Sequence, residues 1–181
     1  MRQTSIILLL VFVVAAASPA LAQRRVPDTG MGAIGASVGA ALPTETNLEN
    51  GLELAGNLEG YLTPRVSIRA QLGTAWMDFG GNTAKPLFAD GNVVYNWEGG
   101  QWHPYVTGGV GYYRYHVRDG SDDSNAGLDL GAGFEYFFTR RATLTGELLY
   151  HKVGDVHAPP LVVSDGSFWT FAMGAKTYLG R

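Results

Sequence analysis

The sequence predicts an all-β chain that folds as an eight-stranded antiparallel up-and-down transmembrane β-barrel, preceded by a cleaved signal peptide. The first observation is an export signal at the N-terminus. The second is an alternation of apolar and polar residues with a period of two, and the third is a regular exchange of short and long connections. Only 16% of the residues are charged, below the ~25% of soluble domains, and Gly is abundant at 25 residues.

Residues 1–22 have the pattern of a secretory signal. Arg2 supplies the positive charge, residues 6–17 are apolar, and Ala20-Leu21-Ala22 resembles a cleavage site, so we expect cleavage after Ala22. The alternative, an uncleaved membrane anchor, is disfavoured because the apolar run is shorter than the ~20 residues of a spanning helix. We assign residues 23–30 to a periplasmic lead-in and residues 31–181 to the barrel.

Eight segments alternate as strands do, because successive side chains of a strand point to opposite faces. The strongest patterns lie in residues 52–62 and 66–76, where only Thr63-Pro64 separates two alternating runs. The predicted strands are 32–42, 52–62, 66–76, 87–97, 101–117, 128–136, 142–151 and 168–179.

Connection lengths indicate how these strands are arranged. Short turns are expected near residue 63, at 98–101 and at 139–140, whereas longer loops are expected at 43–50, 79–86, 118–125 and 153–166. In an up-and-down barrel this exchange places all short turns at one rim and all long loops at the other, as in membrane barrels. We therefore expect both termini in the periplasm and four loops outside the cell.

One face of most strands carries the charges and the other face is nearly free of them. A charge-free face suits lipid, because Arg or Lys facing mid-membrane costs about 2–4 kcal/mol. The charged face then fills the lumen, where acidic and basic side chains neutralise one another as a hydrogen-bonded plug. The predicted lumen network is Glu53, Glu59, Arg69, Asp90, Arg114, Asp129, Glu135, Glu147 and Lys176.

Strand 101–117 does not divide cleanly, because its more apolar face also carries Arg114. We expect Arg114 to point inward, away from lipid, so that Tyr105, Tyr113 and Tyr115 point outward. These tyrosines would then belong to the aromatic girdles at the membrane surfaces. The complete predicted girdle is Trp76, Trp97, Tyr105, Tyr113, Tyr115, Tyr136, Tyr150 and Trp169.

A family resemblance rests on two stretches. Residues 135–150 resemble a hairpin, and residues 104–113 resemble the fifth strand, of small outer-membrane β-barrel domains of the OmpA/OmpX and opacity-protein type. The segment 59–72 repeats the pattern of 135–148, as expected for repeated hairpins. The resemblance implies an eight-stranded barrel in the outer membrane of a Gram-negative-type bacterium. The chain departs from the family at its end, Leu179-Gly180-Arg181, where an aromatic residue is usual.

No catalytic or metal-binding motif stands out. Glu147 and His151 share a face of one strand and could meet Ser164 or Ser167, but no H-x-S motif of a lipid-modifying barrel enzyme is present, and interior hydrogen bonding is the preferred role. The acidic loop around Asp122 lacks an EF-hand pattern. The histidines have no paired-ligand spacing, so we expect no metal and no cofactor.

The preferred function is a structural outer-membrane barrel with a side-chain-filled lumen and no enzymatic activity. Alternatives are adhesion or small-ligand binding through the long loops, narrow porin-like or apolar solute passage, a lipid-modifying enzyme, and a soluble lipocalin-like carrier. The partners expected are outer-membrane lipid and the barrel-insertion machinery. With 13 Lys plus Arg against 16 Asp plus Glu, no nucleic-acid partner is expected.

Overall fold

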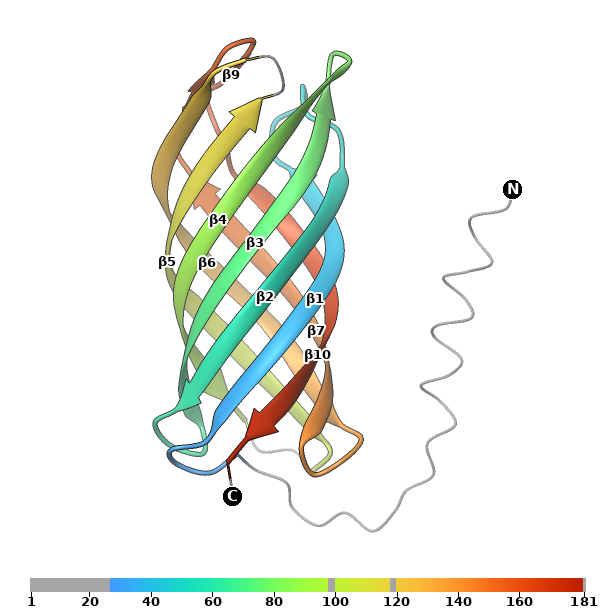
Figure 1. Cartoon of the computed structure of the whole chain (residues 1–181), viewed down its shortest axis with the longest axis vertical. Coiled ribbons are helices and arrows are strands. Elements are labelled where there is room, and N and C mark those ends of the chain that lie inside the picture. The colour runs from blue at the N-terminus through green and yellow to red at the C-terminus, as the bar shows by residue number, and fades with distance from the viewer. Residues whose placement is uncertain (1–26, 98–99, 118–119, 181) are drawn as a thin grey trace, which may run out of the picture.

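Eight antiparallel strands close into a tall barrel in the computed structural model, which describes residues 27–97, 100–117 and 120–180 (Figure 1). Neighbours in the sequence are neighbours in the ring, and β1 closes it on β10. The barrel strands are β1 (Gly32–Pro43), β2 (Gly51–Tyr61), β3 (Val66–Phe79), β4 (Asn82–Asn96), β5 (Trp102–Val117), β6 (Asp122–Phe137), β7 (Ala142–Val153) and β10 (Phe168–Leu179). The predicted eight-stranded antiparallel barrel is confirmed. The predicted signal peptide lies outside the described residues.

A small hairpin of β8 (Val156–Ala158) and β9 (Leu161–Val163) lies in the connection between β7 and β10, at the top of the barrel in Figure 1. We call the rim that carries this hairpin the loop end. The opposite rim, where β1 begins and β10 ends, is the turn end. Among the described residues, no helix is long and apolar enough to cross a membrane.

Two tight turns at the turn end are built in the same way. The Thr63 hydroxyl oxygen accepts hydrogen bonds from the backbone N–H of Arg65 at 3.2 Å and of Val66 at 2.9 Å. Thr139 accepts from the residues at the same spacing, Arg141 and Ala142, at 3.2 and 2.9 Å. A threonine hydroxyl that caps its own turn thus defines both hairpins, which explains the repeat seen in the sequence.

Two of the four predicted long loops are shorter than expected. β3 and β4 continue to a turn at Gly80 and Gly81, both with positive φ, so 79–86 is mostly strand. β6 begins at Asp122, so the second half of 118–125 is strand. These predictions were wrong because polar residues were read as loop, whereas the strands continue beyond the apolar band with polar side chains on the outer wall.

The outer wall between the rims is apolar. Leu130 is 69% exposed and Leu72 is 66% exposed, as expected for side chains that face lipid. Aromatic side chains of this wall pack in pairs near each rim. Near the turn end the pairs are Tyr95 with Trp97 and Trp102 with Tyr136. Near the loop end Tyr150 packs on Trp169. Trp76 also lies on this wall, half-buried under Lys85.

The predicted facing of β5 was wrong. Tyr105, Tyr113 and Tyr115 are buried in the lumen, at 3%, 0% and 0% exposure, whereas the Arg114 side chain is 57% exposed. The prediction assumed that the whole strand crosses lipid. Arg114 instead lies on the extension beyond the apolar band, near the loop end, where it pairs with Asp122 at 2.5 Å. The ion pair with Asp122 partners the outward cation, and the three tyrosines fill the interior.

Candidate functional site

The lumen gathers all the predicted network residues except Arg114. Seven of these are less than 6% exposed, and the side chain of Glu147 is 14% exposed. Six of the eight are carboxylates, and the only two permanent cations are Arg69 and Lys176. The eight residues are Glu53, Glu59, Arg69, Asp90, Asp129, Glu135, Glu147 and Lys176.

Near the turn end every carboxylate has a cationic partner. Lys176 donates to Glu59 and, at 2.5 Å, to Glu135. Arg69 contacts Glu147 at 2.5 Å and lies 3.5 Å from Glu59. We call these five residues the ion-pair cluster. Buried ion pairs hold best when hydrogen bonds complete their coordination, and neutral donors do so for the three carboxylates, although Arg69 Nε and one terminal nitrogen of its guanidinium make no hydrogen bond.

Tyrosine and serine hydroxyls supply those donors. Tyr105 donates to Glu147 at 2.8 Å, Tyr178 donates to Glu135, and Ser67 donates to Glu59. The Arg69 guanidinium also lies 5.1 Å from the centre of the Tyr105 ring, a cation–π distance. The sequence predicted Tyr105 in the girdle and predicted no role for Tyr178. The period-two pattern of β10 already placed Tyr178 on the face of Lys176.

An aromatic layer closes the lumen below the ion-pair cluster. Tyr61, Phe137 and Tyr178 are each 2% exposed and pack together with Ala33 and Met31. The Tyr61 and Tyr178 hydroxyls lie 3.1 Å apart, and the rings of Phe137 and Tyr178 stack at 5.3 Å. We call this layer the aromatic floor.

Farther towards the loop end lies a second polar group that has no cation beside it. Asp129 on β6 is paired in register with His151 on β7, and Asp90 projects inward from β4. The Tyr113 hydroxyl donates to Asp129 at 3.0 Å and lies 2.9 Å from His151 Nδ1. We call Asp90, Asp129 and His151 the acidic triad. None of its members contacts Arg69 or Lys176 by an ion pair among the described residues.

A hydrophobic layer closes the lumen at the loop end. Its buried side chains include Met77, Phe88, Tyr115 and Phe168 from the barrel wall. The β8–β9 hairpin adds Val156, Ala158, Leu161 and Val163, all 5% exposed or less. We call residues 156–163 the lumen cap. The apolar side chains of Val156, Ala158, Leu161 and Val163 turn inward, whereas His157, Pro159, Pro160 and Val162 remain exposed.

Hydrogen bonds fasten the cap to the barrel rim. The Asp123 carboxylate accepts from the His157 backbone N–H at 2.7 Å, and the Pro159 carbonyl accepts from the Ser121 N–H at 3.0 Å. Nearby, burial alone would raise the pKa of Asp165. Hydrogen bonds from Ser167 and the ammonium group of Lys152, at 3.2 Å, outweigh it and hold that pKa below its ordinary value.

The serine residues do not complete a hydrolase site. Ser164 donates to Glu45 at 3.0 Å, and Ser167 exchanges hydrogen bonds with the backbone of Val153. His151 instead contacts Tyr113 and Asp129, while Glu147 belongs to the ion-pair cluster. The residue types of a Ser/His/acid triad are thus present but serve separate neighbours.

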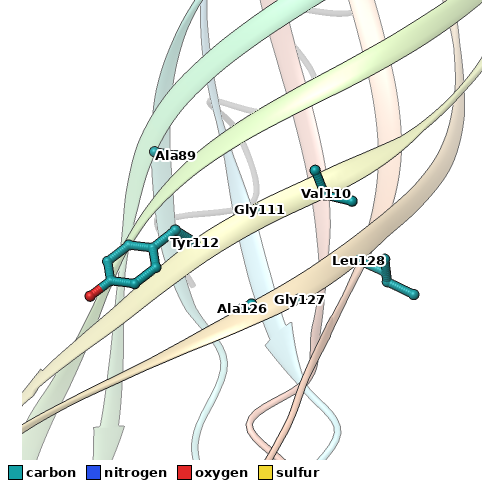
Figure 2. A pocket seen from close by; sticks show the side chains of 7 residues that line it. All are labelled: Ala89, Val110, Gly111, Tyr112, Ala126, Gly127 and Leu128. Carbon is teal, nitrogen blue, oxygen red and sulfur yellow. The ribbon is translucent and has the colours of Figure 1, made fainter.

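The outer wall is hollowed where β4, β5 and β6 meet (Figure 2). The hollow lies over the short outward side chains of Ala89 and Ala126, which stand beside the larger Val110, Tyr112 and Leu128. Gly111 and Gly127, which face each other in register, lie behind it. A Cβ at either position would lie 2.8 Å from the Tyr113 ring on the lumen side. The tyrosine ring therefore backs the wall behind the hollow. Its lining residues are Ala89, Val110, Gly111, Tyr112, Ala126, Gly127 and Leu128.

Solved structures of other proteins share this barrel. Neisserial surface protein A is 15% identical over 82% of this chain and 97% of its own, with a TM-score of 0.68. The outer membrane protein OprG from Pseudomonas aeruginosa is 13% identical, with 88% and 100% coverage and a TM-score of 0.70. Ail, the attachment invasion locus protein of Yersinia pestis, is 11% identical, with 83% and 99% coverage and a TM-score of 0.60. At these identities the likeness shows the fold alone.

No curated protein matches the chain. Residues 6–176 match the family described as the outer membrane protein beta-barrel domain. That match spans nearly the whole sequence and agrees with the closed barrel, its apolar outer wall and its charged interior. The chain therefore belongs to the outer membrane protein β-barrel domain family.

Proposed function

We propose that this protein is a closed, non-catalytic structural barrel of the outer membrane. The observation that carries the proposal is closure at both ends: the aromatic floor lies below the ion-pair cluster and the lumen cap lies above the acidic triad. Between them the inward side chains of eight strands fill the interior, as expected for a barrel of this size. The exposed apolar wall supplies contact with outer-membrane lipid, and insertion by the barrel-insertion machinery belongs to the same proposal.

Planar-bilayer recording tests closure directly. The mature protein, folded in detergent, is expected to produce no resolved conductance steps above those of a bilayer that received heat-denatured protein. Folding is checked by the gel shift between unheated and boiled samples in SDS. Steady cation-selective steps from the folded protein would overturn the proposal and favour narrow passage of solutes.

Export is the second part of the proposal. The mature chain is expected to begin at Gln23, after cleavage behind Ala22. Protein extracted from the outer-membrane fraction and sequenced from its N-terminus tests both location and cleavage. Recovery from the soluble periplasm, with no gel shift on boiling, would contradict the membrane role and favour a soluble carrier.

Ligand capture at the loop end is a second candidate. The observation that favours it is the charged extension of β5 and β6 beyond the apolar band, where Arg114 and His116 both contact Asp122. The Yersinia pestis protein has been solved with the heparin analogue sucrose octasulfate, which suggests a polyanion as the probe. Titration of the folded barrel with sucrose octasulfate, against the double variant Arg114→Ala/His116→Ala, tests this role. Equal binding by both proteins would count against it.

A further inference from the structure

We propose that the acidic triad, Asp90, Asp129 and His151, binds one divalent transition-metal ion inside the lumen. One ligand atom from each residue lies within 4.8 Å of the others, and all three residues are buried. The residues come from three strands, β4, β6 and β7, so the barrel itself sets their spacing.

The triad has more acceptors than donors. Neither carboxylate oxygen of Asp90, nor Asp129 Oδ2, nor His151 Nε2 makes a hydrogen bond, although the Tyr113 hydroxyl lies close to Asp90. Asp90 is 5% exposed, Asp129 4% and His151 0%. The Tyr113 hydroxyl and the neutral imidazole of His151 carry one proton each, too few for the four carboxylate oxygens of Asp90 and Asp129. Buried lone pairs without partners are costly, and a bound cation would satisfy them.

Charge balance points to a cation as well. Arg69 and Lys176 are both held by carboxylates of the ion-pair cluster. Glu53, whose Oε2 also has no partner, adds a further buried carboxylate to the described lumen. Unpaired buried charges are strongly unfavourable, so a dication at the triad would compensate a concentration of negative charge that the protein leaves unpaired.

The surroundings fit a prepared site. The imidazole ring of His151 stacks on Phe168 at 4.5 Å and packs near Phe88 at 5.1 Å, which fixes its orientation. Glycine at position 111 leaves room for Asp90, because a Cβ there would lie 2.3 Å from Asp90 Oδ1. Orientation of ligating side chains by their neighbours is typical of metal sites.

The ligand set selects the kind of ion. Imidazole favours Zn²⁺, Fe²⁺ and other later first-row ions, whereas an all-oxygen set would favour Mg²⁺ or Ca²⁺. Zn²⁺ accepts both imidazole nitrogen and carboxylate oxygen as ligands, and a site with three protein ligands leaves a fourth coordination position for water. Zn²⁺ is therefore the probe of choice, and Mg²⁺ is the comparison ion.

The test uses tag-free mature protein, folded in detergent with excess Zn²⁺, passed through a desalting column and assayed for metal by mass spectrometry. We expect about one zinc per barrel, and at least a tenfold loss of zinc in each of the variants Asp90→Asn, Asp129→Asn and His151→Gln. Folding of every variant is checked by the SDS gel shift. The matched controls Asp122→Asn and His116→Gln make the same changes on the outer wall and are expected to keep the zinc.

Access gives a second readout. Because the floor and the cap close both ends, zinc bound during folding is expected to resist EDTA, and to be released when the barrel is unfolded. Absence of zinc from the folded wild-type protein would overturn the proposal and leave protonation as the means of neutralising the triad. Equal zinc in the wild type and all three triad variants, or equal retention of Mg²⁺, would also overturn it. These measurements are independent of conductance, so they distinguish this proposal from that of a closed barrel.

Discussion

The ion-pair cluster and the acidic triad both place carboxylates inside the lumen, but they differ in the groups that compensate the buried charge. In the ion-pair cluster, each carboxylate meets Arg69 or Lys176 and at least one neutral donor. In the acidic triad, one tyrosine hydroxyl lies beside all three residues, and no Lys or Arg of the described residues pairs with them. The difference shows that a balanced total charge does not by itself stabilise a sealed lumen, because each buried charge must be compensated by groups within contact distance.

Breaking the ion-pair cluster is expected to have the largest effect. Lys176→Met removes the cation between Glu59 and Glu135, and the loss of one partner from a buried pair costs about 3–5 kcal/mol. Urea unfolding in lipid vesicles, followed by tryptophan fluorescence, measures the change. Lys85→Met is the matched control on the outer wall, where the lysine is exposed. Similar losses for both variants would show that the cluster contributes no special stability.

The tyrosines of the two groups allow a finer test. Tyr113→Phe removes the hydroxyl that donates to Asp129 and contacts His151, and is expected to cost about 1–3 kcal/mol in metal-free protein. Tyr105→Phe removes one of two donors to Glu147 and is expected to cost about 0.5–1.5 kcal/mol, because Arg69 remains. The same unfolding assay, with EDTA present, ranks the two. The reverse order would contradict the claim that the triad lacks alternative donors.

Two buried glutamates, Glu53 outside the ion-pair cluster and Glu135 inside it, are expected to affect stability differently when changed to glutamine. Glu53→Gln removes a buried charge whose Oε2 has no partner, so stability should stay the same or rise by about 1 kcal/mol. Glu135→Gln leaves Lys176 with one carboxylate fewer and should lower stability. The shift of the SDS unfolding temperature gives both signs in one experiment. A clear loss of stability in Glu53→Gln would mean that its carboxylate has a favourable partner.

The smallest predicted effect on stability is that of Arg114→Ala, with Arg69→Ala as its contrast. Arg114→Ala breaks an exposed ion pair with Asp122, and exposed pairs contribute little, so the unfolding midpoint should not change measurably. Arg69→Ala, which uncovers Glu147 and Glu59 inside the lumen, serves as the contrasting variant. A marked shift in Arg114→Ala would indicate that the strand extension helps to hold the barrel closed.

Strand periodicity predicted most of the fold because it is a local property. Leu52 to Leu62 and Val66 to Trp76 alternate so regularly that one face of each had to meet lipid and the other the lumen. The same alternation placed Glu59, Arg69, Glu135 and Lys176 on the inner face, where the structure has them. It could not show which acid meets which base, because partners such as Lys176 and Glu59 lie on strands that are distant in sequence.

The errors on β5 and on two of the loops share one cause, which is the assumption that membrane thickness matches strand length. β3 to β6 are longer than predicted, so 79–86 is mostly strand, half of 118–125 is strand, and Arg114 faces outward near the loop end, where Asp122 partners it. The apolar residues of the lumen cap pack inward because they cover the open end of the lumen, which no single segment of sequence reveals.

By itself, the sequence determined the all-β architecture, the number of barrel strands and, in every barrel strand except β5, the division between lipid-facing and lumen-facing residues, because each follows from alternation along one strand and from connection length. Tertiary structure alone decided the facing of β5, the inward packing of the lumen cap and the separation of the ion-pair cluster from the acidic triad. Each of these depends on the register between strands and on which side chains the closed ring brings together. The alternation along a single strand determines neither the register nor those contacts.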